Sequence, residues 1–73
     1  NTITGKNSSI TSGVVLCGGA IVGEGCWIAP NSSVIQRINI GNGGYVGLGS
    51  VVLSNVGENS VVVGVPAKLL KKK

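Results

Sequence analysis

The chain has 73 residues and a formal net charge of +4, with 13 glycines, one Trp, one Tyr and no Phe, Met or His. A domain this small buries only about 60% of its unfolded surface, and without aromatic anchors its core must be a narrow interior filled by small aliphatic side chains. The charge argues against a nucleic-acid-binding protein, because most of it lies in Lys68, Lys71, Lys72 and Lys73 and the body has no basic stripe interleaved with aromatics.

The N-terminal stretch, residues 1–9, keeps the six-residue spacing that follows but has Thr4 where later units have an aliphatic residue. We interpret it as the end of an earlier coil. Because the chain begins at Asn1 in the middle of a unit, we expect it to be a piece of a longer protein. No segment resembles a secretory signal, and the apolar runs are too short and too rich in glycine to span a membrane. We therefore expect a cytoplasmic protein.

A six-residue repeat begins at Ile10 and organises most of the chain. The first place of each unit is aliphatic, at Ile10, Leu16, Val22, Ile28, Val34, Ile40, Val46 and Val52. The fourth place is mostly a residue that tolerates positive φ: Asn7, Gly13, Gly19, Gly25, Asn31, Arg37, Gly43 and Gly49. The fifth place is mostly small. Each unit is therefore predicted to be one short strand and one tight corner, and we expect the corner at Arg37 and Ile38 to be widened or distorted.

Strands this short pair with the strand three units later, once the chain has gone round a triangle, so the period predicts an all-β, parallel β-helix of about three coils. Residues 18 apart then share a position. Ile10, Ile28 and Val46 form one inward column, and the next two columns are Leu16, Val34, Val52 and Val22, Ile40. In this register Cys17 and Cys26 lie on opposite sides of the wall and are predicted to be free thiols, with neither a disulfide nor a metal site.

After Val52 the phase of the repeat breaks. A short bulge or side loop at Leu53–Asn55 is predicted to lead into a last strand through Val61–Val63. We divide the chain into coils at 1–63 and a C-terminal cap and basic tail at 64–73. Within the cap, Pro66 followed by Ala67-Lys68-Leu69-Leu70 favours a short helix with Pro in its first turn, which would lay Leu69 or Leu70 over the open end.

The hexads, the run Val46-Gly47-Leu48-Gly49-Ser50-Val51-Val52 and the ending Gly64-Val65-Pro66-Ala67-Lys68 together resemble the C-terminal part of the hexapeptide-repeat acyltransferases. The resemblance covers nearly the whole chain. It implies a left-handed β-helix, which is an exception to the usual right-handed crossover. It also implies a homotrimer that binds acetyl-CoA or another acyl-CoA between neighbouring subunits and transfers the acyl group to an amine or hydroxyl of a sugar or nucleotide-sugar.

Carried onto this sequence, the resemblance places coil-corner contacts to the pantetheine arm at Gly47 and Leu48, and contacts to the phosphates at Lys68 and Lys71. Pro30, one coil from Leu48, lacks an N–H and has only its carbonyl to offer. The family often has Thr-Lys after the paired valines, whereas this chain has Leu53-Ser54.

The catalytic residue is left open by the sequence. The family commonly uses a His as the base, and this chain has none. Glu24 and Glu58 fall at exposed places, and Cys17 has no neighbouring His or Lys in the pattern to activate its thiol as a nucleophile. The alternative is a non-catalytic trimerisation or structural β-helix module, or a truncated scaffold that keeps only the shape. Trp27 and Tyr45, 18 residues apart, are predicted to stack outward and to plug a subunit interface.

Overall fold

The computed structural model describes residues 2–73, and those residues contain strands and turns but no helix. Most strands are two residues long and recur every six residues. They are β1 (Ile3–Thr4), β2 (Ser9–Ile10), β3 (Val15–Leu16), β4 (Ile21–Val22), β5 (Trp27–Ile28), β6 (Ser33–Val34), β7 (Asn39–Ile40), β8 (Tyr45–Val46), β9 (Val51–Val52), β10 (Ser60–Val63) and β11 (Lys68–Lys72).

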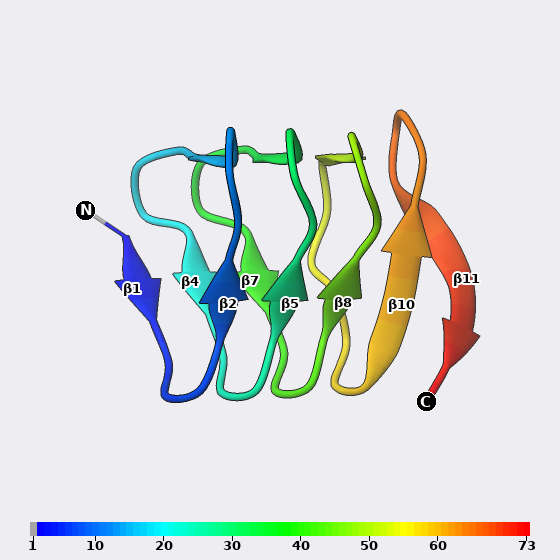
Figure 1. Cartoon of the computed structure of the whole chain (residues 1–73), viewed down its shortest axis with the longest axis horizontal. Coiled ribbons are helices and arrows are strands. Elements are labelled where there is room, and N and C mark those ends of the chain that lie inside the picture. The colour runs from blue at the N-terminus through cyan, green and yellow to red at the C-terminus, as the bar shows by residue number, and fades with distance from the viewer. Residues whose placement is uncertain (1) are drawn as a thin grey trace.

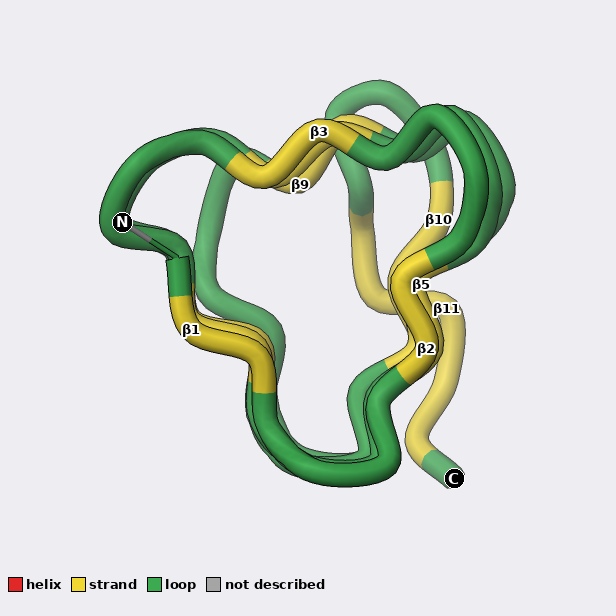
Figure 2. The backbone as a smooth tube through the Cα atoms, turned by 60° about the vertical axis from the view of Figure 1, so that its left-hand side comes forward, coloured by secondary structure: helices red, strands yellow, loops and turns green. Residues whose placement is uncertain are grey.

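The strands stack into three sheets that form the three sides of a prism. The strand orders are β1-β4-β7, β3-β6-β9 and β11-β10-β8-β5-β2, and every pair except β10 with β11 is parallel. Figure 1 shows the coils side by side, with β1 at one end of the stack and β11 at the other. Figure 2 shows the chain tracing a triangle in each coil. The prediction of a parallel β-helix of about three coils is confirmed.

The inward columns have the predicted register. Ile10 pairs with Ile28 and Ile28 with Val46, while Leu16, Val34 and Val52 form a second row of partners and Val22 and Ile40 a third. The aliphatic members of the middle and last coils are almost completely buried, with Ile28 and Val34 at 0% exposure. Burying such a side chain contributes about 1.5–3 kcal/mol, so these columns are the core that holds the prism together.

All the predicted corner residues adopt positive φ, including Asn31 at 62° and Gly25 at 65°. Arg37 also has a φ of 63°, and its N–H donates to the Gly18 carbonyl (N···O 3.2 Å) as at the other corners. The expectation of a distorted corner was therefore wrong. The reason is that the next residue, Ile38, is accommodated in the interior at 8% exposure beside the columns, so the backbone does not have to give way.

The break in the repeat after Val52 appears as a shortened coil. Val56 pairs with Ile40 and Val62 with Val46, each 16 residues earlier instead of 18. Leu53, Ser54 and Asn55 lie in the irregular stretch between β9 and Val56. The predicted irregular stretch at Leu53–Asn55 and the strand through Val61–Val63 are confirmed, but the coil is shortened and not bulged, and β11 follows that strand. Asn59 supplies one more positive-φ corner at 56°.

The predicted C-terminal helix is wrong. Lys68–Lys72 form β11, which runs antiparallel to β10 with a β-bulge opposite Val61 and Val62. β10 leaves a row of backbone groups unpaired on the side away from β8, and pairing with that row satisfies the backbone of a whole strand. A helix of four residues would be too short to hold itself together. Leu69 and Leu70 accordingly remain 61% and 62% exposed.

The described residues include no helix long and apolar enough to cross a membrane. Cys17 and Cys26 are both free thiols, as predicted, with Cys26 buried and Cys17 partly exposed. Trp27 and Tyr45 stack on the outside of one sheet, with ring centroids 6.4 Å apart and an interplanar angle of 25°. This outward stacking was also predicted.

Candidate functional site

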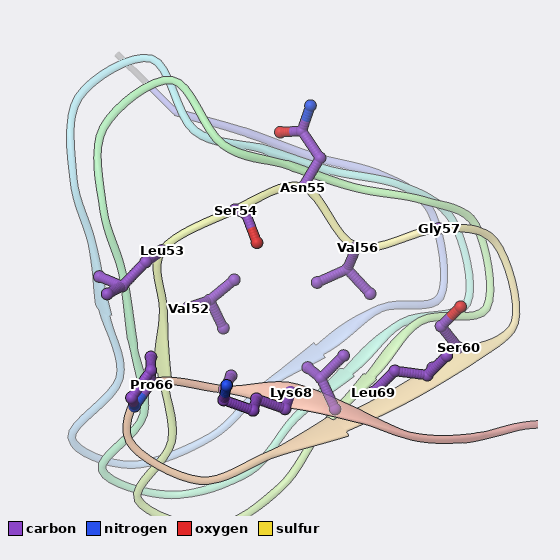
Figure 3. Close-up of a pocket in the computed structure, with 12 residues that line it drawn as sticks. Val52, Leu53, Ser54, Asn55, Val56, Gly57, Ser60, Pro66, Lys68 and Leu69 are labelled. Carbon is purple, nitrogen blue, oxygen red and sulfur yellow. The ribbon is translucent and has the colours of Figure 1, made fainter.

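The C-terminal end of the prism is hollowed, because the shortened last coil and β11 do not close it. The hollow has a volume of about 500 Å³. Its walls are the irregular segment Leu53–Gly57 on one side and Pro66–Leu69 on the other, and Val52, Ser60 and Val62 complete its lining. Figure 3 shows these two segments facing each other across the open triangle, with the Ser54 hydroxyl directed inward and Asn55 directed away.

Gly47, a predicted corner contact, is fully engaged within the protein. Its N–H donates to the Val62 carbonyl (N···O 2.8 Å), and its own carbonyl accepts from the Ser50 N–H (3.2 Å) and the Ser32 hydroxyl (2.9 Å). A Cβ at this position would lie 2.6 Å from Val63 Cγ1. Glycine is therefore needed here for the close approach of the last strand, and its N–H is not free for a ligand.

Leu48, the other corner residue, is placed very differently. Its side chain is 73% exposed. At most of the earlier corners the third-place carbonyl accepts from the fourth-place N–H of the next coil, as Ser12 does from Asn31 (3.0 Å) and Pro30 from Gly49 (3.0 Å). This ladder stops at Leu48, whose N–H and carbonyl form no backbone hydrogen bond with any other described residue. Leu48 thus has free backbone groups at the corner, while the Pro30 carbonyl already has a partner.

Lys68 and Lys71 are both exposed on β11, but they line different surfaces. Lys68 lines the end hollow. Lys71 lines a groove of about 390 Å³ on the outer face of the five-stranded sheet, together with Tyr45, Val61, Val63, Leu70 and Lys73. In the ladder Lys68 lies opposite Val63 and Lys71 opposite Val61. Since Val63 is next to Gly47, Lys68 is the lysine closer to the predicted corner.

Several of these lining residues had not been predicted from the sequence. Ser54 and Asn55 lie at the end hollow, and Tyr45 with Leu70 lines the outer groove. The break in hexad phase at Leu53–Asn55 was the signal for the first pair, because a repeat that changes length leaves an end uncovered. The groove had no signal in the repeat, since it depends on how β11 pairs with β10.

No catalytic base emerges from the described residues. Glu24 and Glu58 are both exposed at corners. The backbone N–H of Cys17 donates to the Val34 carbonyl (2.9 Å), and the sequence contains no His to activate its thiol. Among residues 2–73, no three His, Cys, Asp or Glu side chains come together as a metal site would require.

Comparison with known proteins gives a consistent set of relatives. The chain is 44% identical over 52 residues to WbbJ of Escherichia coli K12, described as an O-acetyl transferase of lipopolysaccharide biosynthesis, covering 71% of this chain and 26% of WbbJ. It is 39% identical over 69 residues to a serine acetyltransferase of Buchnera aphidicola, covering 94% of this chain and 23% of that protein. No protein-family profile matches.

Solved structures show the same relationship. The serine acetyltransferase of Neisseria gonorrhoeae superposes with a TM-score of 0.93 at 38% identity, over 97% of this chain and 30% of its own. A serine acetyltransferase in complex with CoA superposes with a TM-score of 0.92 at 31% identity, over 96% of this chain and 31% of its own.

The fold is therefore a left-handed parallel β-helix, as in the serine acetyltransferases with which the chain superposes. The chain belongs to the hexapeptide-repeat acyltransferases, as the repeat and the Gly-Val-Pro-Ala-Lys ending had indicated. It spans about a quarter to a third of the length of these relatives.

Proposed function

We propose that this chain supplies the β-helix of a CoA-dependent acyltransferase and that its C-terminal end takes part in binding acetyl-CoA or another acyl-CoA. The observation that carries the proposal is the likeness to a serine acetyltransferase that binds CoA, over 96% of this chain at 31% identity. Of the predicted site residues, Gly47 and Leu48 follow β8 directly, and Lys68 and Lys71 belong to β11.

We assign a distinct role in acyl-CoA binding to each of these residues. The free N–H and carbonyl of Leu48 suit the amides of a pantetheine arm, whereas Gly47 serves by letting Val63 approach. Lys68 and Lys71 offer flexible ammonium groups to phosphates, as point charges and not as rigid forks. Acyl-CoA supplies the activated acyl group, and this chain's residues bind and orient it.

For the acceptor, we propose a hydroxyl or amine of a sugar or nucleotide-sugar. The support is the identity of 44% to WbbJ, because lipopolysaccharide is built from sugars. Serine is the competing acceptor, since serine acetyltransferases match at up to 39% identity among the relatives described above. An assay that offers sugars and serine separately, with the full-length protein, decides between them by which acceptor is acylated.

We further propose a cytoplasmic homotrimer of parallel prisms, with the acyl-CoA held between neighbouring subunits. The exposed stacked pair of Trp27 and Tyr45 supports an interface on this face, since aromatic residues are enriched at such contacts. In the same proposal, residues 1–63 form the coils and residues 64–73 form a C-terminal cap and basic tail.

A non-catalytic trimerisation or structural module is the second candidate. The absence of His from the chain favours it, because general acid–base catalysis supplies about 10²–10⁴-fold in rate. We expect the 73-residue chain by itself to bind CoA yet to transfer acyl groups slowly.

Isothermal titration calorimetry with CoA tests the proposal. Binding should weaken as salt rises, because exposed charges are screened over about 8–10 Å at physiological ionic strength. Lys68→Ala should weaken it further, whereas the matched control Lys6→Ala, on the first coil, should not. No detectable heat at millimolar CoA would leave the structural module as the better account.

A further inference from the structure

The net charge of the chain is concentrated at one end of the prism. In the rest of the chain Lys6 and Arg37 balance Glu24 and Glu58, so the whole formal charge of +4 comes from the four lysines between residues 68 and 73. All four are exposed. Three of them belong to β11, which lies at the opposite end of the stack from β1 (Figure 1). The body is neutral and one end is strongly cationic.

Apolar side chains lie exposed beside these lysines. Leu69, Leu70 and Val65 are 61%, 62% and 72% exposed, all within the hairpin that β10 and β11 form, residues 60–72. The groove on the outer face of the five-stranded sheet is lined by both apolar side chains and lysines. Its lining is Tyr45, Val61, Val63 and Leu70, with Lys71 and Lys73 as the charged members.

Two simpler explanations cover only part of this surface. Lysines on an edge strand prevent pairing with another sheet edge, but a strand that served only this purpose would carry no exposed leucines between its lysines. Contacts to CoA phosphates would use Lys68 and Lys71 and would leave Lys72 and Lys73 without a part. The combination of exposed cations and exposed leucines on one hairpin is what a membrane surface recognises.

We propose that the β10–β11 hairpin is a docking surface for an anionic lipid membrane. The lysine ammonium groups meet the lipid phosphates, and Leu70 and Val65 enter the boundary between headgroups and acyl chains, while Leu69 lines the end hollow. The charge complementarity commits this surface to an anionic leaflet, because a neutral bilayer would leave four lysines without partners. A parallel homotrimer would present three hairpins at one end, but the proposal rests on the hairpin of a single chain.

The expected strength follows from the number of charges. Each lysine near an anionic membrane surface strengthens binding about fivefold, so the four together give a preference for anionic over neutral lipid on the order of several hundredfold at low salt. The preference should shrink as salt rises, since the surface potential falls off within a Debye length.

Co-sedimentation of the full chain with vesicles tests the proposal. Vesicles of phosphatidylcholine containing one third phosphatidylglycerol should bind the chain at an ionic strength of about 0.15 M, and vesicles of phosphatidylcholine alone should bind it at least about a hundredfold less well. The double variant Lys72→Gln/Lys73→Gln should lose about 25-fold in binding. Leu70→Ser should also weaken binding, with all four lysines kept.

The matched control is Lys6→Gln/Arg37→Gln, which removes the same charge from the body of the prism and should change vesicle binding by less than about twofold. Circular dichroism should show the same fold for all variants, since every substituted side chain is exposed. Because Lys72 and Lys73 are not assigned to CoA, calorimetry with CoA should be unchanged in their double variant. The vesicle experiment can therefore refute membrane docking without refuting CoA binding, and calorimetry can refute CoA binding without refuting membrane docking.

Three results would overturn the proposal. They are equal binding to neutral and anionic vesicles, equal losses in the tail variant and the control variant, and capture of an acidic polypeptide such as polyglutamate without binding to anionic vesicles. The last of these would assign the hairpin to a protein partner instead.

Discussion

The regular coils, residues 2–52, and the C-terminal segment, residues 53–73, differ in how closely they follow the six-residue repeat. In the coils each residue's environment follows from its place in the hexad, so the third-place carbonyl of most corners accepts from the fourth-place N–H of the next coil. In the C-terminal segment the spacing drops from 18 to 16 and a hairpin replaces the next coil, so the carbonyl of Leu48, at the end of the regular coils, has no backbone partner among the described residues. The regular coils form the scaffold. The change of spacing after Val52 leaves the Leu48 carbonyl without a backbone partner, leaves the end hollow open and puts exposed lysines on β11.

The largest effect is expected inside the columns. Ile28 is 0% exposed between Ile10 and Val46, so Ile28→Asp would place an unpaired charge in a dry interior. We expect loss of the folded state, measured as loss of the β signal in circular dichroism. Ile28→Val is the matched control and should cost only about 0.5–1.5 kcal/mol. A folded Ile28→Asp variant would refute the register of the columns.

The junction between the two regions can be tested at Gly41. A Cβ at this position would lie 2.7 Å from the Glu58 backbone nitrogen, so Gly41→Ala must push the shortened coil away. We expect a loss of about 2 kcal/mol in unfolding free energy from such overpacking. Gly25→Ala is the matched comparison, because its Cβ would meet nothing within 4 Å. Its only cost is that alanine must adopt a φ of 65°, which costs about 1 kcal/mol of unfolding free energy. Equal losses in denaturant melts would mean that the two coils do not pack this closely.

The prediction for Trp27 extends the comparison to the outer face. If the stacked pair of Trp27 and Tyr45 plugs a subunit interface, Trp27→Ala should raise the dissociation constant of the trimer at least about tenfold, since Trp is among the commonest hot-spot residues. Analytical ultracentrifugation over a concentration series measures this. An unchanged trimer would assign the pair to the surface of a single prism.

The smallest effect is expected at Asn31. This corner already has a φ of 62°, and glycine adopts that conformation without strain. Asn31→Gly should therefore change the unfolding free energy by no more than about 0.5 kcal/mol. A larger loss in thermal melts would show that the Asn31 side chain contributes more than its backbone conformation does.

The sequence was sufficient to predict the coils, because a period of six specifies both the inward column and the corner. Ile28 and Gly25 are examples, since each position depends only on its own unit and on partners 18 residues away. Arg37 was misjudged because residue preferences for positive φ are weaker than the packing of Ile38 beside the columns. At this corner tertiary packing, and not residue preference, determines the backbone conformation.

The C-terminal segment was predicted less well because its structure depends on a partner strand. Ala67–Leu70 have reasonable helix preferences, yet the unpaired side of β10 offered backbone partners that four residues cannot provide for themselves. For the same reason the sequence did not show that Lys68 and Lys71 line different surfaces. That separation follows from the pairing of β11 and the bulge opposite Val61 and Val62.

Mapping CoA binding by nuclear magnetic resonance of the ¹⁵N-labelled chain tests most directly the claim that the interrupted end carries the site. Titration should shift the amide signals of Leu48 and Lys68, while those of Ile10 and Ile21, in the first two coils, stay in place. The Gly47 amide should shift less than that of Leu48, because its N–H is already bonded to Val62. Shifts confined to the first coils, or none at saturating CoA, would contradict the account.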